Sequence, residues 1–472
     1  MSVDRAEVAA CVAVLARLDD ADLDESTRAE LERAVVTAYR GVKKRARSRR
    51  ATRSREADRA LLATATRFHT EIPDPAPPDP DATPAARAVT PAEAVAEPVA
   101  ADAAPAGPAG PGTLRRARRC YVCKTPYRQV DVDYHLMCPP CAEENRRRRY
   151  ARCDLTGRTA VVTGGRVKIG FHTALKLLRD GAEVIVTTRF PRDAARRYAA
   201  VPDFDDWADR LYVHGLDLLD LPGLLDFIGL VQRRFAGLDI LINNAAQTLY
   251  RPAAYYREIR QAETTALSGP AARVAIGGST PAPTDGPALP ARLDALFPPG
   301  LRDETGEQLD LRDVNSWVLR DADVSPHEWL QVHVVNAFAP FLLTSRLRPL
   351  METSVHPRRY VVQVSAMEGS YSRSTKTVRH PHTNMAKAAL NMLVRTVAAD
   401  YLTSGIHMNS VDTGWVTDER PHPSKRAQRD LGFRPPLDVI DGAARVYDPI
   451  VRGEAGAPVS GLFLKDYRSV PW

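Results

Sequence analysis

The stretch "TAVVTGGRVKIGFHTALKLL", residues 159–178, decides the fold. It begins with an apolar run of strand length, passes through a glycine-rich turn and continues as a helix. A turn of this kind places backbone N–H groups and the N-terminus of a helix against a pyrophosphate. The turn alone is a weak indicator, so its weight depends on the strands and motifs later in the chain.

From about residue 155 onward, short apolar runs alternate with helical patterns. Buried parallel strands are nearly continuous Val/Ile/Leu runs, and the intervening helices cover both faces of their sheet. We therefore predict an α/β fold with a Rossmann-type, doubly wound parallel sheet. The predicted strands are RTAVVTGG, AEVIVTTR, DRLYVHGLD, LDILINNAA, RRYVVQVSA, GIHMNSVDTG and VSGLFLKD.

Composition divides the chain into four parts, and no internal repeat is visible. Residues 1–70 show helical periodicity, and residues 71–112 form a Pro/Ala-rich linker with too few large apolar groups for a core. Residues 113–152 form a small cysteine module. Residues 153–472 form the Rossmann-type domain, which has an insertion at 247–324.

The insertion contains "YYREIRQAE", which we expect to be helical, and "LSGPAARVAIGGSTPAPTDGPALPARL", which we expect to be a loop. Connections this long are usually functional or disordered. We expect a lid over the substrate side of the cleft or a partner surface, and a segment without a role is the alternative. "SPHE" (325–328) then has the pattern of a capping box at the start of a helix.

Charge and hydropathy are ordinary for a soluble protein. The 65 Lys and Arg residues exceed the 58 Asp and Glu residues by seven, and the positive charge is clustered locally. No apolar run approaches the ~18 residues of a membrane span. The first residues lack the basic flank and cleavage site of a secretory signal. A cytoplasmic location is the default expectation.

Four of the six cysteines form two C-x-x-C pairs, "CYVC" and "CPPC", which fourteen residues separate. Four thiolates suit a closed tetrahedral Zn²⁺ site, and the metal would stabilise a module too small to fold by apolar burial alone. A redox pair and chance are the alternatives. We expect His135 to be a surface residue or to lie behind the ligands. The predicted metal ligands are Cys120, Cys123, Cys138 and Cys141.

Arginine clusters flank this module at 115–119 and 146–149, and residues 43–55 hold eight basic residues in thirteen. Such clusters could hold phosphates, including nucleic acid, or an acidic protein surface. The alternative is a solvated charge run. We favour the solvated run, because no aromatic stacking platform accompanies the arginines.

The order of motifs resembles the short-chain dehydrogenase/reductase (SDR) family over roughly residues 155–467. The family's glycine pattern is T-G-x-x-x-G-x-G, and this chain has Thr163, Gly164 and Gly170 but Lys168 at the middle glycine. "GLDL", "NNAA", "VVNAFAPF" and "SVDTGWVT" match later family motifs in order. In the family, the motif that matches "GLDL" contacts adenine, and the motif that matches "NNAA" closes the cofactor cleft.

The resemblance and the charges together predict the cofactor. NAD enzymes place a carboxylate after the second strand, whereas NADP enzymes place an arginine there. The strand ends in "VIVTTRF", so Arg189 favours NADP over NAD, as do Arg166 and Lys168 in the turn. Weakened cofactor binding is the alternative, because Lys168 prevents a close backbone approach. The predicted cofactor residues are Thr163, Gly164, Arg166, Lys168, Ile169, Gly170, Arg189, Asp217, Leu218, Asn244, Ala245, Lys387, Thr413, Gly414 and Val416.

The resemblance also implies a reaction site with two replacements. The family's Y-x-x-x-K motif is "TNMAK" here, with Thr383 and Lys387. Its strand-end serine motif is "SAMEG", so the usual serine slot is Ala366, after Ser365. Asn336 matches the family's active-site asparagine. The lysine would hold the ribose, while a threonine hydroxyl is too weak an acid to replace a phenol.

An active enzyme therefore needs another proton donor. The loop before Thr383 is about four residues longer than is usual in the family and contains Tyr371, His380 and His382. Histidine titrates near ~6.5 and suits acid–base catalysis, and Tyr371 could act as a displaced phenol. The alternative is that all three are surface residues.

These residues leave three functions open. The first is an atypical NADP-dependent oxidoreductase acting on an unknown carbonyl or alcohol. The second is a non-catalytic NADP-binding sensor or adaptor whose zinc module binds a macromolecule. The third is other chemistry on the same fold, such as that of a dehydratase or an epimerase. SDR proteins commonly dimerise, so a homo-oligomer is an expectation of the resemblance.

Overall fold

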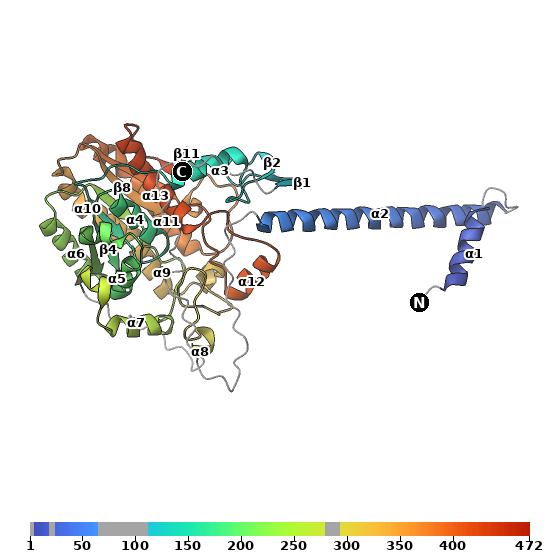
Figure 1. The fold of residues 1–472 in the computed structure, drawn as a ribbon, viewed down its shortest axis with the longest axis horizontal. Helices are drawn as coiled ribbons and strands as arrows, with labels where there is room; N and C mark the ends of the chain where they lie inside the picture. Colours follow the sequence, from blue (N-terminus) through green and yellow to red (C-terminus); the bar gives the residue numbers. More distant parts are fainter. Residues whose placement is uncertain (1–3, 18–23, 65–111, 279–292) are drawn as a thin grey trace.

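The computed structural model describes residues 4–17, 24–64, 112–278 and 293–472 (Figure 1). Within these residues a nine-stranded sheet has the strand order β11-β10-β9-β8-β6-β3-β4-β5-β7. Every neighbouring pair is parallel except β10 and β11. The strands are β3 (Thr159–Thr163), β4 (Glu183–Thr188), β5 (Leu211–Gly215), β6 (Ile240–Asn243), β7 (Ala275–Gly278), β8 (Arg359–Ser365), β9 (Ile406–Asp412), β10 (Phe463–Lys465) and β11 (Arg468–Val470).

The seven predicted strands and the doubly wound α/β class are confirmed. One expectation is wrong: the segment expected to be a loop contributes β7, which pairs in parallel with β5 and extends the sheet edge. A short Ala/Ile/Gly stretch carries no strand signal of its own, so the partner strand decides its conformation. The terminal antiparallel hairpin of β10 and β11 was also not predicted.

Helices cover both faces of the sheet. One apolar core lies under α4, α5 and α13, and the other lies under α6, α10 and α11. The helices of this domain are α4 (Lys168–Arg179), α5 (Pro191–Ala199), α6 (Leu221–Arg234), α7 (Arg257–Thr264), α8 (Leu293–Leu296), α9 (Pro326–His333), α10 (Ala339–Glu352), α11 (Pro381–Thr403), α12 (His422–Asp430) and α13 (Val439–Glu454). A π-helical turn, Val334–Phe338, joins α9 to α10.

The N-terminal part is helical, as predicted. It consists of α1 (Arg5–Leu15) and the long helix α2 (Glu25–Thr64), which projects away from the rest of the molecule in Figure 1. The predicted linker lies outside the described residues except for Gly112. Among the described residues, no helix combines the length and the apolar composition needed to cross a bilayer.

The cysteine module consists of β1 (Gly112–Arg119), β2 (Pro126–Val130) and α3 (Pro139–Arg149). Its small core includes Leu114, Tyr127 and Met137, and Leu437 of the Rossmann-type domain packs into the same core. Arg149 is buried in ion pairs with Asp438 and Asp441, at 2.6 and 3.1 Å. The module is therefore fixed to the start of α13 by both apolar and charged contacts.

Candidate cofactor and reaction site

The candidate site lies where the strand order reverses. β3 is central, β4 lies on one side of it and β6 on the other, and ligands bind such sheets at the carboxyl ends of these strands. The hydroxyl of Thr163 accepts hydrogen bonds from the N–H groups of Asn244 and Ala245, both at 3.0 Å. The amide of Asn244 donates to the carbonyls of Thr163 and Gly164. These bonds fix the turn after β3 against the strand end of β6.

The glycine-rich turn is tightly packed. A Cβ on Gly170 would lie 2.2 Å from the carbonyl oxygen of Gly164, and Gly164 has a φ of +70°. Lys168 also has a positive φ, +54°. The lysine at the position of the family's middle glycine therefore adopts a backbone conformation that favours glycine. A non-glycine residue there costs about 1–2 kcal/mol. No side chain caps the first turn of α4, which leaves N–H groups for a pyrophosphate.

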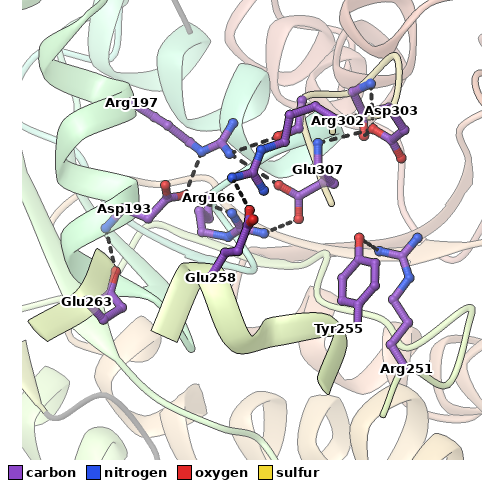
Figure 2. Close-up of polar contacts among 12 residues, drawn as sticks. Arg166, Asp193, Arg197, Arg251, Tyr255, Glu258, Glu263, Arg302, Asp303 and Glu307 are labelled. Atoms are coloured by element: carbon purple, nitrogen blue, oxygen red, sulfur yellow. Dashed lines mark hydrogen bonds and ion pairs between the residues drawn. The ribbon is translucent and has the colours of Figure 1, made fainter. Parts of the chain in front are cut away.

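The two cations of this turn are already paired. Arg166 is buried and contacts the carboxylates of Asp193 and Glu307, the former at 2.8 Å (Figure 2). Arg197 contacts the same two carboxylates, at 2.6 and 3.2 Å. Burial raises the pKa of Glu307, but the two arginines outweigh it and hold that pKa below its ordinary value. The ammonium of Lys168 lies 3.3 Å from Glu419.

Arg189 also has a partner from the insertion. Its guanidinium donates to the Tyr256 hydroxyl at 2.8 Å and lies 4.6 Å from the centre of that ring. Asp217 is buried and accepts from the N–H of Leu219, and Leu218 is buried beside it. Tyr256 thus stacks on Arg189, which the sequence assigns to the adenosine end of the cofactor. Glu307 pairs with Arg166, the other arginine that favours NADP in the sequence.

The insertion is held in place by its own contacts. The carboxylate of Glu263 accepts from the N–H groups of Arg192 and Asp193 at the start of α5, and Glu258 binds Arg302 at 2.8 Å (Figure 2). A small pocket with room for about 30 Å³ remains between the glycine-rich turn, the insertion and the segment after β9. Its lining is mostly charged and includes Lys168, Arg251, Asp303, Glu304, Glu419 and Lys425.

Lys387 is buried on α11, and its ammonium donates to the carbonyl of Val364 at 2.8 Å. Burial lowers the pKa of Lys387 to about 8. The hydroxyl of Ser365 bonds to Asn391, also on α11, at 2.7 Å. Asn336 lies in the π-helical turn, where it accepts from the N–H of Gln247 at 2.6 Å and donates to the Gln247 carbonyl at 3.1 Å. Asn336 therefore holds the segment directly after "NNAA".

The candidate proton donors have different surroundings. His382 is buried and its Nε2 lies 3.1 Å from a carboxylate oxygen of Glu328. Within the described residues, its Nδ1 and the hydroxyl of Thr383 have no hydrogen-bond partner. His380 stacks on Trp317 with ring centres 4.3 Å apart, and its ring Nδ1 lies 3.0 Å from the side-chain oxygen of Asn384. Tyr371 is 78% exposed.

Glu328 was not among the predicted site residues. Ser325 accepts from the Glu328 N–H at 3.1 Å, so the first half of the predicted capping box is confirmed. The Glu328 side chain turns to His382 on α11 instead of back to its own helix start. Capping-box glutamates are ordinarily local partners, so the sequence carried no signal for this contact.

The loop after β9 contacts both the turn and the cysteine module. Gly414 has a φ of +77°, and its N–H donates to Asp412 at 2.9 Å. Val416 and Ile169 both lie against Gly442 of α13, so this loop and the start of α4 share a neighbour. Thr413 directly follows β9 and precedes Gly414.

The four predicted metal ligands lie together. The sulfur atoms of Cys120, Cys123, Cys138 and Cys141 are all within 4.8 Å of one another. Tetrahedral zinc with bonds of about 2.3 Å requires sulfurs about 3.8 Å apart, and Cys123 and Cys138 are at 3.6 Å. The N–H of Cys138 also donates to the Cys120 sulfur at 3.4 Å. The donor set fits Zn²⁺. His135 is buried, not on the surface, and lies outside the sulfur cluster.

The fold and the site at the reversal of the strand order define a class, the doubly wound α/β proteins of the Rossmann type. Family comparison narrows this class. Residues 158–267 match the family model described as short chain dehydrogenase, and residues 318–430 match the one described as enoyl-(acyl carrier protein) reductase. The chain belongs to the short-chain dehydrogenase/reductase family.

Three curated proteins illustrate the similarity. The chain is 33% identical over 346 residues to the uncharacterized protein R665 of Acanthamoeba polyphaga mimivirus, and the match spans 71% of each chain. It is 36% identical over 91 residues to (+)-neomenthol dehydrogenase of Capsicum annuum, and 37% identical over 89 residues to carbonyl reductase [NADPH] 1 of Sus scrofa. These two matches cover 19% of this chain and only 28% and 30% of the enzymes.

Among solved structures, NADPH-bound carbonyl reductase from chicken fatty liver aligns with 67% of this chain and 100% of its own, at 18% identity and a TM-score of 0.42.

Proposed function

We propose that this protein is an NADP(H)-dependent oxidoreductase that interconverts a carbonyl and an alcohol, with a proton donor other than tyrosine. The observation that carries the proposal is the buried ammonium of Lys387, one helical turn after Thr383 and bonded to the end of β8, the strand beside β6. Family membership supports the reaction class. Arg189 at the end of β4 supports NADP over NAD.

The residues fit the central part of such a cofactor. The uncapped start of α4 offers N–H groups to the pyrophosphate, and Lys387 is the cation for the sugar hydroxyls. Bound NADPH would supply the hydride. Tyr256 and Glu307 stand at the adenosine end, so they must withdraw from Arg189 and Arg166 before a 2′-phosphoadenosine group can bind there.

We assign the proton donation to His382. Glu328 orients its Nε2, which leaves Nδ1 without a partner in the described residues. As the carbonyl carbon receives the hydride, a protonated His382 would deliver its Nδ1 proton to the carbonyl oxygen. Thr383, also without a partner at its hydroxyl, would hold that oxygen by a hydrogen bond. Asn336 would keep the loop at Gln247 in position.

The test is a fluorescence titration with NADPH of the wild type and Lys387→Ala, followed by NADPH oxidation with a panel of aldehydes and ketones. We expect wild-type binding, and at least tenfold weaker binding in the variant. His382→Gln should lose at least about 100-fold in turnover while it retains NADPH binding. Tyr371→Phe is the matched control and should keep full turnover. Full turnover in His382→Gln would contradict the proton-donor assignment.

A non-catalytic NADP-binding sensor or adaptor is the second candidate. It is favoured by the occupied adenosine end, where the chain's own Tyr256 and Glu307 stand, and by threonine at the position of the family tyrosine. NADPH binding without turnover on any carbonyl of the panel would support this candidate over the enzyme.

We also propose that the four-cysteine cluster holds a structural zinc ion. Metal analysis of the purified chain should give one zinc per molecule, and Cys120→Ser should lose it. Cys11→Ser, at an exposed cysteine of α1, is the matched control and should keep the metal. Unchanged zinc content in Cys120→Ser would refute the site.

A further inference from the structure

The arginine clusters around the cysteine module are used in different ways. Arg146 contacts Asp131, Asp133 and Glu143 at 2.7–3.1 Å, and Arg148 contacts Asp448 at 2.6 Å. With the buried pairs of Arg149, the cluster at 146–149 is part of the internal structure of the module and of its attachment to the main domain. This cluster is therefore not a free cationic surface.

The other cluster is exposed and adjoins α2. All four arginines of the 115–119 segment are exposed on β1. The carboxylate of Asp58, near the end of α2, accepts from the N–H groups of Arg115 and Arg116, at 2.7 and 3.1 Å. Leu61 of α2 packs against Gly112. The last turns of α2 thus lie across β1, and the cations of both elements belong to one surface.

The cations of the 43–55 segment of α2 have no structural role within the described residues. Residues 33–55 contain no Asp or Glu, and the eight basic residues of the 43–55 segment are exposed. Within the described residues, none of these eight is paired with a carboxylate. Cations three and four residues apart on a helix repel each other by about 0.2–0.5 kcal/mol per pair. A polyanion would convert this repulsion into attraction.

We propose that α2 and β1 form a binding surface for duplex nucleic acid. A membrane-surface helix needs an apolar face, and residues 43–55 contain only Lys, Arg, Ala, Ser and Thr. These cations surround the helix, which suits the two phosphate walls of a groove that is wide enough for a helix. The absence of aromatic residues in the segment disfavours single strands, which bind by base stacking. No Asn or Gln is present, so we expect phosphate contacts without sequence preference.

The experiment is fluorescence anisotropy of the full chain with a labelled 20-base-pair DNA duplex of arbitrary sequence. We expect a dissociation constant of about 1–10 µM at 50 mM salt, with log K falling linearly against log salt at a slope near about −7 for eight phosphate contacts. The variant Arg45→Gln/Arg49→Gln/Arg53→Gln removes three charges from one face of α2. It should reduce the slope by about 3 and the affinity at 50 mM salt by at least tenfold.

The matched control is Arg233→Gln/Arg346→Gln/Arg395→Gln, which removes three exposed charges from the main domain and has the same net charge. It should bind like the wild type, and far-ultraviolet circular dichroism should give equal helix content in all three proteins. Equal loss in both variants, or no binding at 50 mM salt, would overturn the proposal. Equally strong binding to phosphatidylserine vesicles, poly-glutamate or a single strand of the same length would overturn the duplex assignment.

Discussion

The N–H of Trp415 donates a hydrogen bond to the hydroxyl of Tyr121, 3.0 Å away and 294 positions earlier in the chain. Tyr121 belongs to the first C-x-x-C pair, and Trp415 belongs to the loop after β9 that the sequence assigns to the cofactor. The cysteine module therefore contacts a loop of the candidate site directly, which gives the module a positioning role.

We predict that Tyr121→Phe loosens this loop without removing the metal. Loss of one hydrogen bond of this kind costs about 0.5–1.5 kcal/mol. Amide hydrogen exchange at Trp415 should therefore accelerate by about 2- to 12-fold, and zinc content should stay unchanged. Tyr150→Phe, at an exposed tyrosine of the same module, is the control. Unchanged amide exchange at Trp415 in Tyr121→Phe would contradict the proposal that the cysteine module positions the loop after β9.

The contact of Glu307 with Arg166 predicts competition between the insertion and the cofactor. Glu307→Gln keeps the shape but removes one of the two carboxylates that neutralise Arg166. Arg166, still paired with Asp193, then attracts a phosphate more strongly, while the fold loses about 1.5–3 kcal/mol from a charged hydrogen bond. We expect a lower melting temperature together with about tenfold tighter NADPH binding, measured by calorimetry. Asp205→Asn, at an exposed carboxylate paired with Arg273, should change neither the melting temperature nor the affinity for NADPH. Weaker NADPH binding in Glu307→Gln would contradict the competition.

Burial of Lys387 predicts a pH-dependent stability. Its pKa is about 8 in the folded protein against 10.5 for an ordinary lysine, so between these values the unfolded chain binds more protons. The contribution of Lys387 to stability therefore rises with pH across this window and is most unfavourable below pH 8. Relative to wild type, Lys387→Met should be more stable by up to the order of 3 kcal/mol at pH 7.

The stability advantage of Lys387→Met should shrink by pH 9.5, as measured by urea unfolding at both pH values. Lys44→Met, at an exposed lysine of α2, should give no difference at either pH. A gap between Lys387→Met and wild type that does not depend on pH would show that position 387 is not buried as a cation.

The positive φ of Lys168 should make glycine more stable than alanine at this position, the reverse of the order in most helical positions. In most helical positions alanine is more stable than glycine by about 1 kcal/mol. At Lys168 the backbone is left-handed, so Lys168→Gly should be more stable than Lys168→Ala by about 1 kcal/mol. Both variants lose the contact with Glu419, which cancels in the comparison. The same pair of substitutions at the exposed Arg395 of α11 should show the ordinary order, measured by thermal unfolding.

Much of the fold could be predicted because its signals are local. An apolar run with its flanking turn is enough to identify a buried parallel strand, and all seven predicted strands are present. β7 could not be predicted from its own residues, because pairing with the edge of β5 decides its conformation. For the cysteine cluster, two short turns with fixed spacing carried the prediction, and the sulfurs meet within 4.8 Å.

The roles of the candidate site residues remain predictions, because their partners come from distant parts of the chain. His382 and Glu328 are 54 positions apart, and Arg166 and Glu307 are 141 apart. No local pattern relates the members of such pairs. The same holds for the two arginine clusters. They are alike in sequence, but the arginines of 146–149 pair with carboxylates of the fold, whereas those of β1 are all exposed.

The sequence by itself determined the doubly wound sheet, its glycine-rich turn and the spacing of the four cysteines, since hydrophobic period and turn chemistry act over a few residues. Only the tertiary structure decided which charges are free. A buried cation needs a carboxylate or another hydrogen-bond acceptor, as Arg166 finds in Glu307 and Lys387 in the Val364 carbonyl. The position of that acceptor depends on the packing of the whole chain.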